Sequence, residues 1–313
     1  MSFKVDGIIV LAGGEGMRLR PLTFDMPKIL VPFMHYDTYL RYLLAYLDMS
    51  LPGIPVAISA GYKADQIQGL CFPGNPMVVV EDVPLGTGGA IVEAIKQTGF
   101  KYPLIMNGDC LMDDIDLDYF VASAQERDCW CTILGVWKHN ASRYGNIRVD
   151  GDIISEFVEK SPIPLSTMDH RGLISSGIYI IDAKKYLDVT SHCNGRFSIE
   201  KEVFEKHHDI AIGYDKYIGS SDLNTYVDIG TIESYRDSQV RLAGGNPVIH
   251  KTAIIGSTTL IDNSIIHEGV HIGDGCLIDR CIIARNAVIE DNCELKNVCI
   301  AAKSIIKRGT RLC

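Results

Sequence analysis

A glycine-rich turn follows the first apolar run of the chain and strongly limits the folds that the chain can adopt. Residues 7–12 are apolar without alternation, which is typical of a buried strand in a parallel sheet. Three glycines follow within four positions, and Arg18 and Lys28 come after them. Glycines let backbone N–H groups approach an anion, and both cations are good phosphate partners. The stretch therefore predicts a phosphate site at the carboxyl end of a sheet strand.

Two common phosphate-binding loops do not fit this stretch. The dinucleotide pattern needs a glycine three residues after Gly16, where Leu19 stands, and no Gly-Lys-Ser/Thr follows for a Walker loop. The alternative interpretation is a tight strand-to-helix turn with surface cations. The length and order of the stretch favour the phosphate site.

The composition is that of a globular protein and excludes several classes. Of 313 residues, 47% are hydrophobic and 22% are charged, and the formal net charge is −9. This acidic balance, without any basic run, argues against a nucleic-acid partner. No apolar run is long enough to span a membrane and no signal peptide precedes the first strand, so we expect a cytoplasmic protein with no membrane partner.

The ten cysteines show neither a disulfide framework nor metal-ligand spacing. No Cys-x-x-Cys occurs, and five of the ten follow residue 275, where small apolar side chains would suit stacked coils. We therefore expect reduced, mostly buried thiols and no zinc site.

Strand and helix patterns alternate through the first hundred residues. Apolar runs predict strands over 7–12, 54–60 and 77–81, with helical spacing over 37–48 and 63–70. This alternation predicts an α/β fold with a mostly parallel, Rossmann-like sheet and helices on both faces.

A second glycine-rich turn, residues 81–90, joins the strand over 77–81 to an apolar helix over 91–95. Its glycines remove side chains where a flat ligand could lie against the backbone. A plain turn with a helix cap is the alternative.

Two aspartates end apolar strands far apart in the sequence. Asp109 follows the strand that begins at residue 104, and Asp228 follows Val227. If folding brings them together, they form the carboxylate pair expected of a phosphate-bound Mg²⁺ site. Alternatively, Asp109 caps the helix expected over 115–124, and Asp228 caps the one over 232–242.

The middle of the chain predicts a hairpin and a further strand. Asp150-Gly151 tolerates a tight turn between strands over 144–149 and from residue 153. The second strand ends in Glu159-Lys160, which by itself is most simply a solvated charge pair. Another apolar strand is expected over 172–181.

A different period takes over after the breaker cluster at 243–247. Apolar residues recur every six positions in two sets, and glycines mark the turns. The first set is Ile254, Leu260, Ile266, Ile272 and Ile278; the second is Cys276, Ile282, Val288, Ile300, Ile306 and Leu312, with Glu294 as its polar member. Six-residue repetition predicts a β-helix whose coils form a core only by stacking.

We therefore expect a catalytic domain over 1–243 and a β-helix domain over 248–313. The open end of so short a stack favours homo-oligomer formation. An acyltransferase site with His250, His267 or His271 as the base is the less favoured alternative.

The stretch from Gly13 to Lys28 resembles the signature loop of the sugar-nucleotide pyrophosphorylases, with Met17 where that family usually has Thr. The resemblance covers residues 5–240 and is nearest to the heptose- and mannose-1-phosphate guanylyltransferases. It implies that the 81–90 loop covers the nucleobase, and that Glu159 and Lys160 hold the sugar hydroxyls and the sugar phosphate. Many relatives place Asn or Thr where Ser175 stands. The C-terminal repeat resembles a left-handed hexapeptide β-helix.

The resemblance implies transfer of a nucleoside monophosphate from a nucleoside triphosphate to a sugar 1-phosphate, with Mg²⁺ as cofactor. GTP with mannose or heptose 1-phosphate is expected; the alternatives are a uridylyl- or thymidylyltransferase acting on glucose 1-phosphate or a related sugar, and a non-catalytic regulatory homologue that binds nucleotide-sugars. The implied catalytic residues are Arg18 and Lys28, and the metal ligands are Asp109 and Asp228. The implied nucleotide-binding residues are Leu11, Ala12, Gly13, Gly14, Gly16, Glu81, Gly86, Thr87, Gly88 and Asn107. The implied sugar-phosphate residues are Tyr144, Gly145, Glu159, Lys160 and Ser175.

Overall fold

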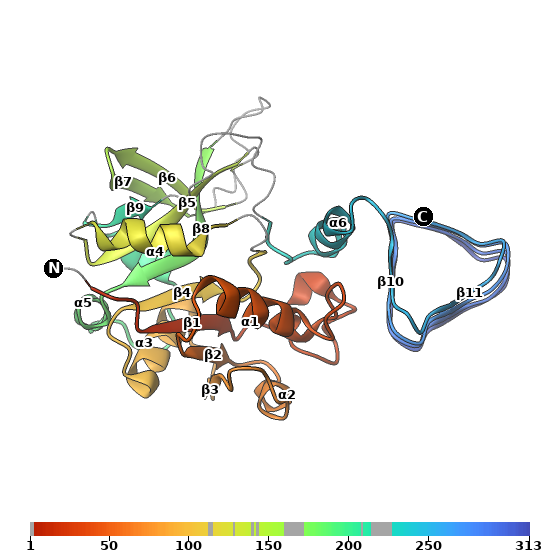
Figure 1. Cartoon of the computed structure of the whole chain (residues 1–313), viewed down its shortest axis with the longest axis horizontal. Helices are drawn as coiled ribbons and strands as arrows, with labels where there is room; N and C mark the ends of the chain where they lie inside the picture. The colour runs from red at the N-terminus through yellow and green to blue at the C-terminus, as the bar shows by residue number, and fades with distance from the viewer. Residues whose placement is uncertain are drawn as a thin grey trace. The chain divides into compact units, whose positions relative to one another are not determined.

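Two units that alternate along the sequence make up the computed structural model (Figure 1). The first unit comprises residues 1–14 and 43–226, and the second comprises residues 15–42 and 227–313. The structure describes residues 3–111, 115–127, 129–138, 141, 144–159, 172–207, 209–213 and 227–313. Within these ranges, no helix is long and apolar enough to cross a membrane.

A nine-stranded sheet, in the order β3-β2-β1-β4-β8-β5-β9-β7-β6, forms the centre of the first unit. Its first four strands are parallel, so their carboxyl ends lie along one edge: Ala12 pairs with Ala60, and Leu11 pairs with Asn107. The strands are β1 (Gly7–Ala12), β2 (Val56–Ala60), β3 (Met77–Val80), β4 (Pro103–Asn107), β5 (Cys131–Lys138), β6 (Asn146–Asp150), β7 (Ile153–Val158), β8 (Gly172–Ile181) and β9 (Ala211–Gly213). The Rossmann-like core is confirmed.

The other half of the sheet is mixed, so the prediction of a mostly parallel sheet holds for β1–β4 but not for the rest of the sheet. β8 runs antiparallel to both β4 and β5, while β9 is parallel to β5. The hairpin predicted at Asp150-Gly151 joins antiparallel β6 and β7, with Gly151 at φ 60°. Antiparallel neighbours need no crossover helix between them.

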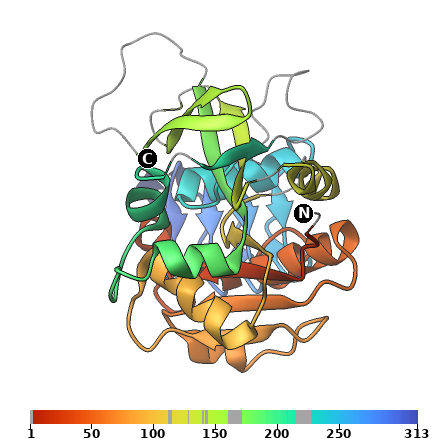
Figure 2. The ribbon, with the colours of Figure 1, turned by 90° about the vertical axis from the view of Figure 1, so that its left-hand side faces the viewer.

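Helices cover both faces of the sheet. They are α1 (Tyr39–Ser50), α2 (Ala64–Gln68), α3 (Gly86–Thr98), α4 (Leu117–Gln125) and α5 (Ala183–Val189). α3 and α5 lie side by side (Figure 2), and both pack with Ile9 of β1 in one core. Ile8 and Val10 point to the opposite face and are also fully buried. Asp116, not Asp109, caps α4, because its side chain accepts from the Tyr119 N–H.

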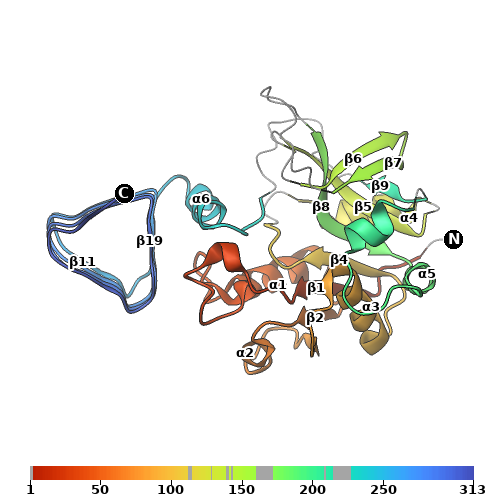
Figure 3. The ribbon, with the colours of Figure 1, turned by 180° about the vertical axis from the view of Figure 1, so that it is seen from behind.

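Three four-stranded parallel sheets, consistent with a β-helix, form the C-terminal part of the second unit and enclose a triangle in cross-section (Figures 1 and 3). Partner residues in successive coils are 17 positions apart, as in Val248↔Ile265 and Asp274 with Asp291. The strands are β10 (Val248–Ile249), β11 (Ile254–Ile255), β12 (Leu260–Asp262), β13 (Ile265–Ile266), β14 (His271–Ile272), β15 (Leu277–Asp279), β16 (Ile282–Ile283), β17 (Val288–Ile289), β18 (Glu294–Lys296), β19 (Cys299–Ile300), β20 (Ile305–Ile306) and β21 (Arg311–Leu312).

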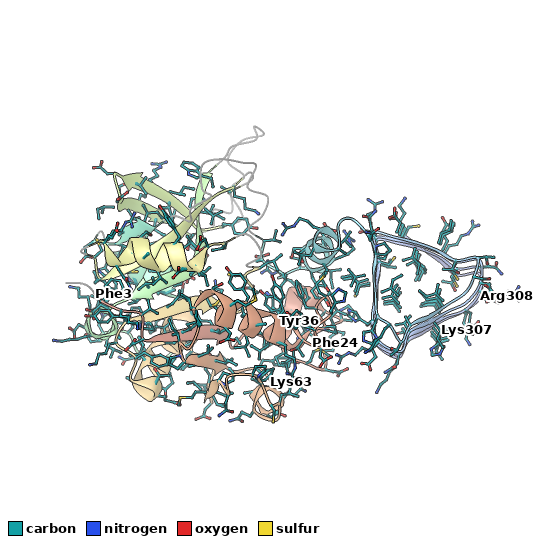
Figure 4. The ribbon with its side chains drawn as sticks, viewed as in Figure 1. Phe3, Phe24, Tyr36, Lys63, Lys307 and Arg308 are labelled. Carbon is teal, nitrogen blue, oxygen red and sulfur yellow. The ribbon has the colours of Figure 1, made fainter. Side chains whose placement is uncertain are left out.

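The coil of 17 residues corrects the strict six-residue repeat. Ile266, Ile272 and Ile278 point inward as predicted, but Ile254 and Leu260 are 59% and 67% exposed. Three repeats of six would make a coil of 18 residues, so a coil of 17 has one step of five. The series of inward residues therefore continues through Ile283, Ile289, Leu295 and Ile300. The sequence showed two shifted sets because each set follows the true series for only part of its length. Figure 4 shows the side chains that fill the triangle, with Lys307 and Arg308 on an outer turn.

All ten cysteines are free thiols, as the sequence predicted, and three of them lie inside the coils. Cys276, Cys281 and Cys293 are each no more than 1% exposed. Each thiol donates a weak hydrogen bond to a backbone carbonyl in or beside its own coil. These cysteines therefore act as small core residues.

Helix α6 (Ile232–Leu242) covers the outer face of the sheet β10-β13-β16-β19. Ile265 and Ile282 alternate with the inward residues of their strands, yet they are 2% and 0% exposed. A capping box between Thr231 and Ser234 starts α6, so Asp228 is not its cap. The capping alternative for Asp228 is thereby removed.

A buried tyrosine–histidine pair links α6 to the coils. The hydroxyl of Tyr235 lies 3.2 Å from Nε2 of His267, and the two rings meet edge to face. Because the Tyr235 hydroxyl donates to the Pro32 carbonyl, His267 must donate through Nε2–H. Burial lowers the pKa of His267 to about 3, with the charges of Arg285 and His250 acting in the same direction. Burial also raises the pKa of Tyr235, so both groups stay neutral at ordinary pH.

We predict that His267 makes the second unit less stable in acid. The folded pKa of about 3 lies below the ordinary value of 6.5, so only the unfolded chain takes up a proton as the pH falls from 6.5. The stabilisation present at pH 7 should decrease by about 2 kcal/mol at pH 5. Urea unfolding followed by circular dichroism at both pH values measures this loss.

The substitution His267→Gln should flatten the loss of stability between pH 7 and pH 5. His271→Gln is the matched control, because His271 is exposed on strand β14. If His267→Gln keeps the full pH dependence of the wild type, the assignment is wrong.

Candidate functional site

Three predicted functional groups converge around Gly230 in the second unit. A Cβ built on Gly230 would lie 3.1 Å from Nη2 of Arg18, 3.2 Å from Nζ of Lys28 and 3.6 Å from Cγ of Asp228. Arg18 comes from a 3₁₀ turn, Met17–Leu19, and Lys28 begins another, Lys28–Leu30. Two cations and one carboxylate thus share one spot, which suits a phosphate chain and a cation bound to it.

The loop that carries these cations is closed by contacts of its own. The Thr23 hydroxyl donates to the Gly16 carbonyl at 2.8 Å, and Gly16 adopts φ 63°. A Cβ on Gly16 would lie 3.0 Å from Cβ of Lys28. Gly16 is therefore required by the backbone conformation and by the close approach of Lys28.

The two other glycines of the turn differ from Gly16 and from each other. A Cβ on Gly13 would lie 2.4 Å from Oε1 of Glu81. By contrast, a Cβ on Gly14 would have no described atom within 4 Å, and Gly14 has no positive φ. Neither the backbone conformation nor any described neighbour therefore requires glycine at position 14. This is the pattern expected if the glycine leaves the backbone accessible to a ligand.

The carboxylate of Glu81 connects the ends of neighbouring strands in the first unit. Its Oε1 accepts from the Ser59 hydroxyl at 3.0 Å, and its Oε2 accepts from the Leu85 N–H at 3.1 Å. Both oxygens thus serve to hold the sheet edge beside Gly13. Glu81 supports the turn, and direct contact with a nucleotide stays a prediction.

The second glycine-rich stretch is the first turn of a helix, which corrects the expected loop. α3 begins at Gly86 rather than near Ile91, and Gly86 adopts φ 70°. A Cβ on Gly88 would lie 2.2 Å from a ring carbon of Phe197, and the Gly88 N–H donates to the Phe197 carbonyl at 3.0 Å. The space that the glycines leave is filled by Phe197, so the expected bare platform for a flat ligand is not present there.

Thr87 ties the same turn to the segment after Phe197. Its hydroxyl donates to Oε2 of Glu200 at 2.9 Å and accepts from the Ile199 N–H at 3.0 Å. Sequence reasoning did not assign a role to Phe197 or Glu200, because only the fold brings them to α3. Nucleobase contacts of Gly86, Thr87 and Gly88 stay predictions.

Asp109 follows β4 at the same edge as the first turn. The N–H of Gly108 donates to the Leu11 carbonyl at 2.8 Å, which places Asp109 beside the end of β1. Asn107 lies against Gly177 of β8, whose φ is 73° and whose added Cβ would meet Nδ2 of Asn107 at 2.3 Å. The half-buried Asp109 therefore sits where the parallel strands end.

Asp109 belongs to the first unit and Asp228 to the second, so their approach stays a prediction. Among the described residues, the one group of His, Cys and carboxylate side chains close enough for a shared metal is His192, Cys193 and Glu202. The ammonium of Lys206 already pairs with Glu202.

Three of the predicted sugar-phosphate residues lie together in the first unit. The Ser175 N–H donates to the Gly145 carbonyl at 3.0 Å, and a Cβ on Gly145 would lie 3.3 Å from Oε2 of Glu159. Tyr144 is adjacent to Gly145, and Nζ of Lys138 lies over its ring, 5.4 Å from the ring centroid. Lys138, at the end of β5, is a cation that the sequence analysis missed. Lys160 lies outside the described residues.

The three histidines considered for acyl transfer all have partners. His267 is buried against Tyr235, Nδ1 of His250 lies 2.9 Å from the Thr252 hydroxyl, and Nδ1 of His271 lies 3.1 Å from the Gly269 carbonyl. These contacts are structural, and they supply no argument for an acyltransferase.

Comparison with known proteins places most of the chain in one family model. The nucleotidyl transferase model matches residues 7–244, and the GMPPB C-terminal domain model matches residues 243–313. A D-glycero-alpha-D-manno-heptose 1-phosphate guanylyltransferase from Aneurinibacillus thermoaerophilus is 30% identical over 239 residues, which are 75% of this chain and 97% of that protein. A mannose-1-phosphate guanylyltransferase from Mycobacterium tuberculosis is 28% identical, covering 78% of this chain and 66% of that protein.

The solved structures include a similar fold with a nucleotide analogue. HddC from Yersinia pseudotuberculosis, crystallised in complex with GMP-PN, superposes with a TM-score of 0.60 at 28% identity. The match covers 76% of this chain and all of the HddC chain (100%).

We predict that Gly14→Ala weakens triphosphate binding without weakening the fold. The new methyl group meets no described atom of the protein, so the free energy of unfolding should stay within about 0.5 kcal/mol of the wild type. The KM for the nucleoside triphosphate should rise about tenfold, because the methyl group enters the space left for the phosphates. Steady-state kinetics and urea unfolding measure the two effects.

Gly13→Ala is the contrasting variant, because its methyl group would meet Glu81. It should lose stability by about 1–3 kcal/mol. An unchanged KM in a well-folded Gly14→Ala variant would contradict the phosphate assignment.

Proposed function

The chain belongs to the nucleotidyl transferase family, and on that premise we propose that it transfers a guanylyl group from GTP to mannose 1-phosphate or a heptose 1-phosphate. The observation that carries the proposal is the convergence of Arg18, Lys28 and Asp228 around Gly230. The guanylyltransferases among the relatives, and the guanine nucleotide analogue bound to HddC, support the base and the sugar.

The reaction is an in-line displacement at phosphorus. An oxygen of the sugar 1-phosphate attacks the α-phosphorus of GTP, the bond to the β-phosphate oxygen breaks, and its electron pair leaves with pyrophosphate. Arg18 binds the triphosphate and the charge that grows on the leaving pyrophosphate, while Lys28 neutralises the phosphates across the reacting centre. Positioning and charge neutralisation supply most of the rate, because the protein forms no covalent intermediate.

Magnesium is the cofactor that this carboxylate pair suits. Asp109, which follows β4, and Asp228, which precedes α6, are both partly exposed carboxylates, and Asp228 stands beside the two cations that hold the phosphates. Mg²⁺ usually takes one or two carboxylates together with phosphate oxygens. The ion would be held by both aspartates and would neutralise the charge of the triphosphate.

The sugar 1-phosphate lies against the second half of the sheet in this proposal. Glu159 accepts from sugar hydroxyls, Ser175 and Tyr144 line the same place, and Lys160 neutralises the sugar phosphate. The support is the proximity of Gly145, Ser175 and Glu159. Lys138 adds a positive charge beside Tyr144.

The C-terminal coils have an assembly role in this proposal, as a left-handed β-helix that joins copies of the chain. Their outer face on the sheet β11-β14-β17-β20 exposes Ile254 (59%) and Ile305 (58%). Ten free thiols agree with a reducing, cytoplasmic environment.

We predict that a substrate panel gives pyrophosphate fastest with GTP and either mannose or heptose 1-phosphate. The panel pairs GTP, ATP, UTP and dTTP with mannose, heptose and glucose 1-phosphates, and coupled pyrophosphate release gives kcat/KM for each pair. Preference for UTP or dTTP with glucose 1-phosphate would overturn the proposed substrates. Nucleotide-sugar binding without pyrophosphate from any pair would indicate a regulatory homologue.

We predict that Asp109→Asn lowers turnover at least about 100-fold at saturating substrates and raises the Mg²⁺ concentration needed for half-maximal rate. Asp65→Asn, on the exposed side of α2, is the control and should leave both values unchanged. Full turnover in a folded Asp109→Asn variant would end the metal assignment.

A further inference from the structure

Two side chains of α6 hold the backbone of the segment that follows Lys28. The Tyr235 hydroxyl donates to the Pro32 carbonyl, and Oε1 of Gln239 accepts from the Met34 N–H at 2.6 Å. Tyr235 and Gln239 are four residues apart and therefore lie on one face of the helix. Both are 1% exposed or less, so these hydrogen bonds are shielded from water.

Backbone hydrogen bonds connect the held segment to Lys28. The Val31 N–H donates to the Lys28 carbonyl at 3.2 Å, and the Val31 carbonyl accepts from the Tyr39 N–H at 2.8 Å. Phe33 and Tyr36 exchange backbone hydrogen bonds across a tight turn, with Met34 at φ 50° between them. We therefore expect a shift of the backbone at residues 32–34 to displace Lys28.

Helix α6 is also fixed to the C-terminal coils. His267 contacts the Tyr235 hydroxyl at 3.2 Å. The guanidinium of Arg236, 6% exposed, donates to the Arg280 carbonyl at 2.8 Å and to Oδ1 of Asn297 at 3.2 Å. Two successive coils thus hold α6, and α6 in turn holds the loop that carries Arg18 and Lys28.

We propose that Tyr235 and Gln239 are positioning residues for catalysis: they fix the backbone that sets Lys28 beside Arg18 and Asp228. This inference rests on the proposed function, in which these groups bind the triphosphate. It gives the C-terminal coils a second role, as the support on which the catalytic cations are aligned.

Tyr235→Phe tests the proposal, because it removes one hydroxyl and keeps the ring. The kcat/KM for the nucleoside triphosphate should fall about tenfold, while the KM for the sugar 1-phosphate stays unchanged. Tyr46→Phe is the matched control: its hydroxyl also donates to a backbone carbonyl, that of Ile115, but in the first unit. Thermal unfolding of both variants measures how much stability each loses with its hydroxyl.

Hydrogen exchange at the Met34 and Val31 amides supplies a readout that needs no activity. Protection of both amides should fall in Tyr235→Phe and in Gln239→Ala, and it should stay at the wild-type level in Tyr46→Phe. If the wild type shows no pyrophosphate release, the proposed function fails while the exchange result still tests the linkage.

Two results would overturn the positioning role. One is wild-type exchange at Met34 and Val31 in Tyr235→Phe. The other is a fall in rate that affects both substrates equally and matches the loss in Tyr46→Phe, which would show a structural effect alone.

Discussion

The placement of two cations next to each other beside one carboxylate is the constraint on which the second unit depends. Arg18 and Lys28 both come within about 3 Å of one point near Gly230, where their charges repel. Asp228 offsets part of this repulsion, and a triphosphate would offset more. Because two like charges repel each other, other contacts must hold the loop that carries them, and these include the Thr23–Gly16 hydrogen bond and the hydrogen bonds from α6.

Helix α6 meets this requirement through its position rather than through its charge. It starts directly after the stretch from Asp228 to Gly230, and its buried face reaches Pro32 and Met34. The same helix packs against β13 of the C-terminal sheets, where Ile265 is buried. One helix of eleven residues therefore joins the cation cluster to the coils, and any change in its packing reaches both.

The sequence predicts this molecule well where a local pattern determines the structure. The bounds of β1, the hairpin at Gly151 and the bounds of α6 all follow from periodicity and turn chemistry. It fails where a distant residue decides: Phe197 fills the space left by the glycines of α3, and antiparallel β8 interrupts the parallel sheet. That each coil has 17 residues rather than the 18 of a strict six-residue repeat is visible only once the coils are aligned in register.

In the site, too, some residues could be predicted from the sequence and others could not, and the reason is chemical. Arg18, Lys28 and Asp228 contribute charged side chains, so their residue types mark them in the sequence. The contacts that hold them in place go to backbone atoms, such as the carbonyl of Pro32 and the N–H of Met34. Every residue has a carbonyl, and all except proline have an N–H, so nothing in the sequence of the loop identifies Tyr235 or Gln239 as its partners. Positioning residues of this kind become visible only when the packed structure is known.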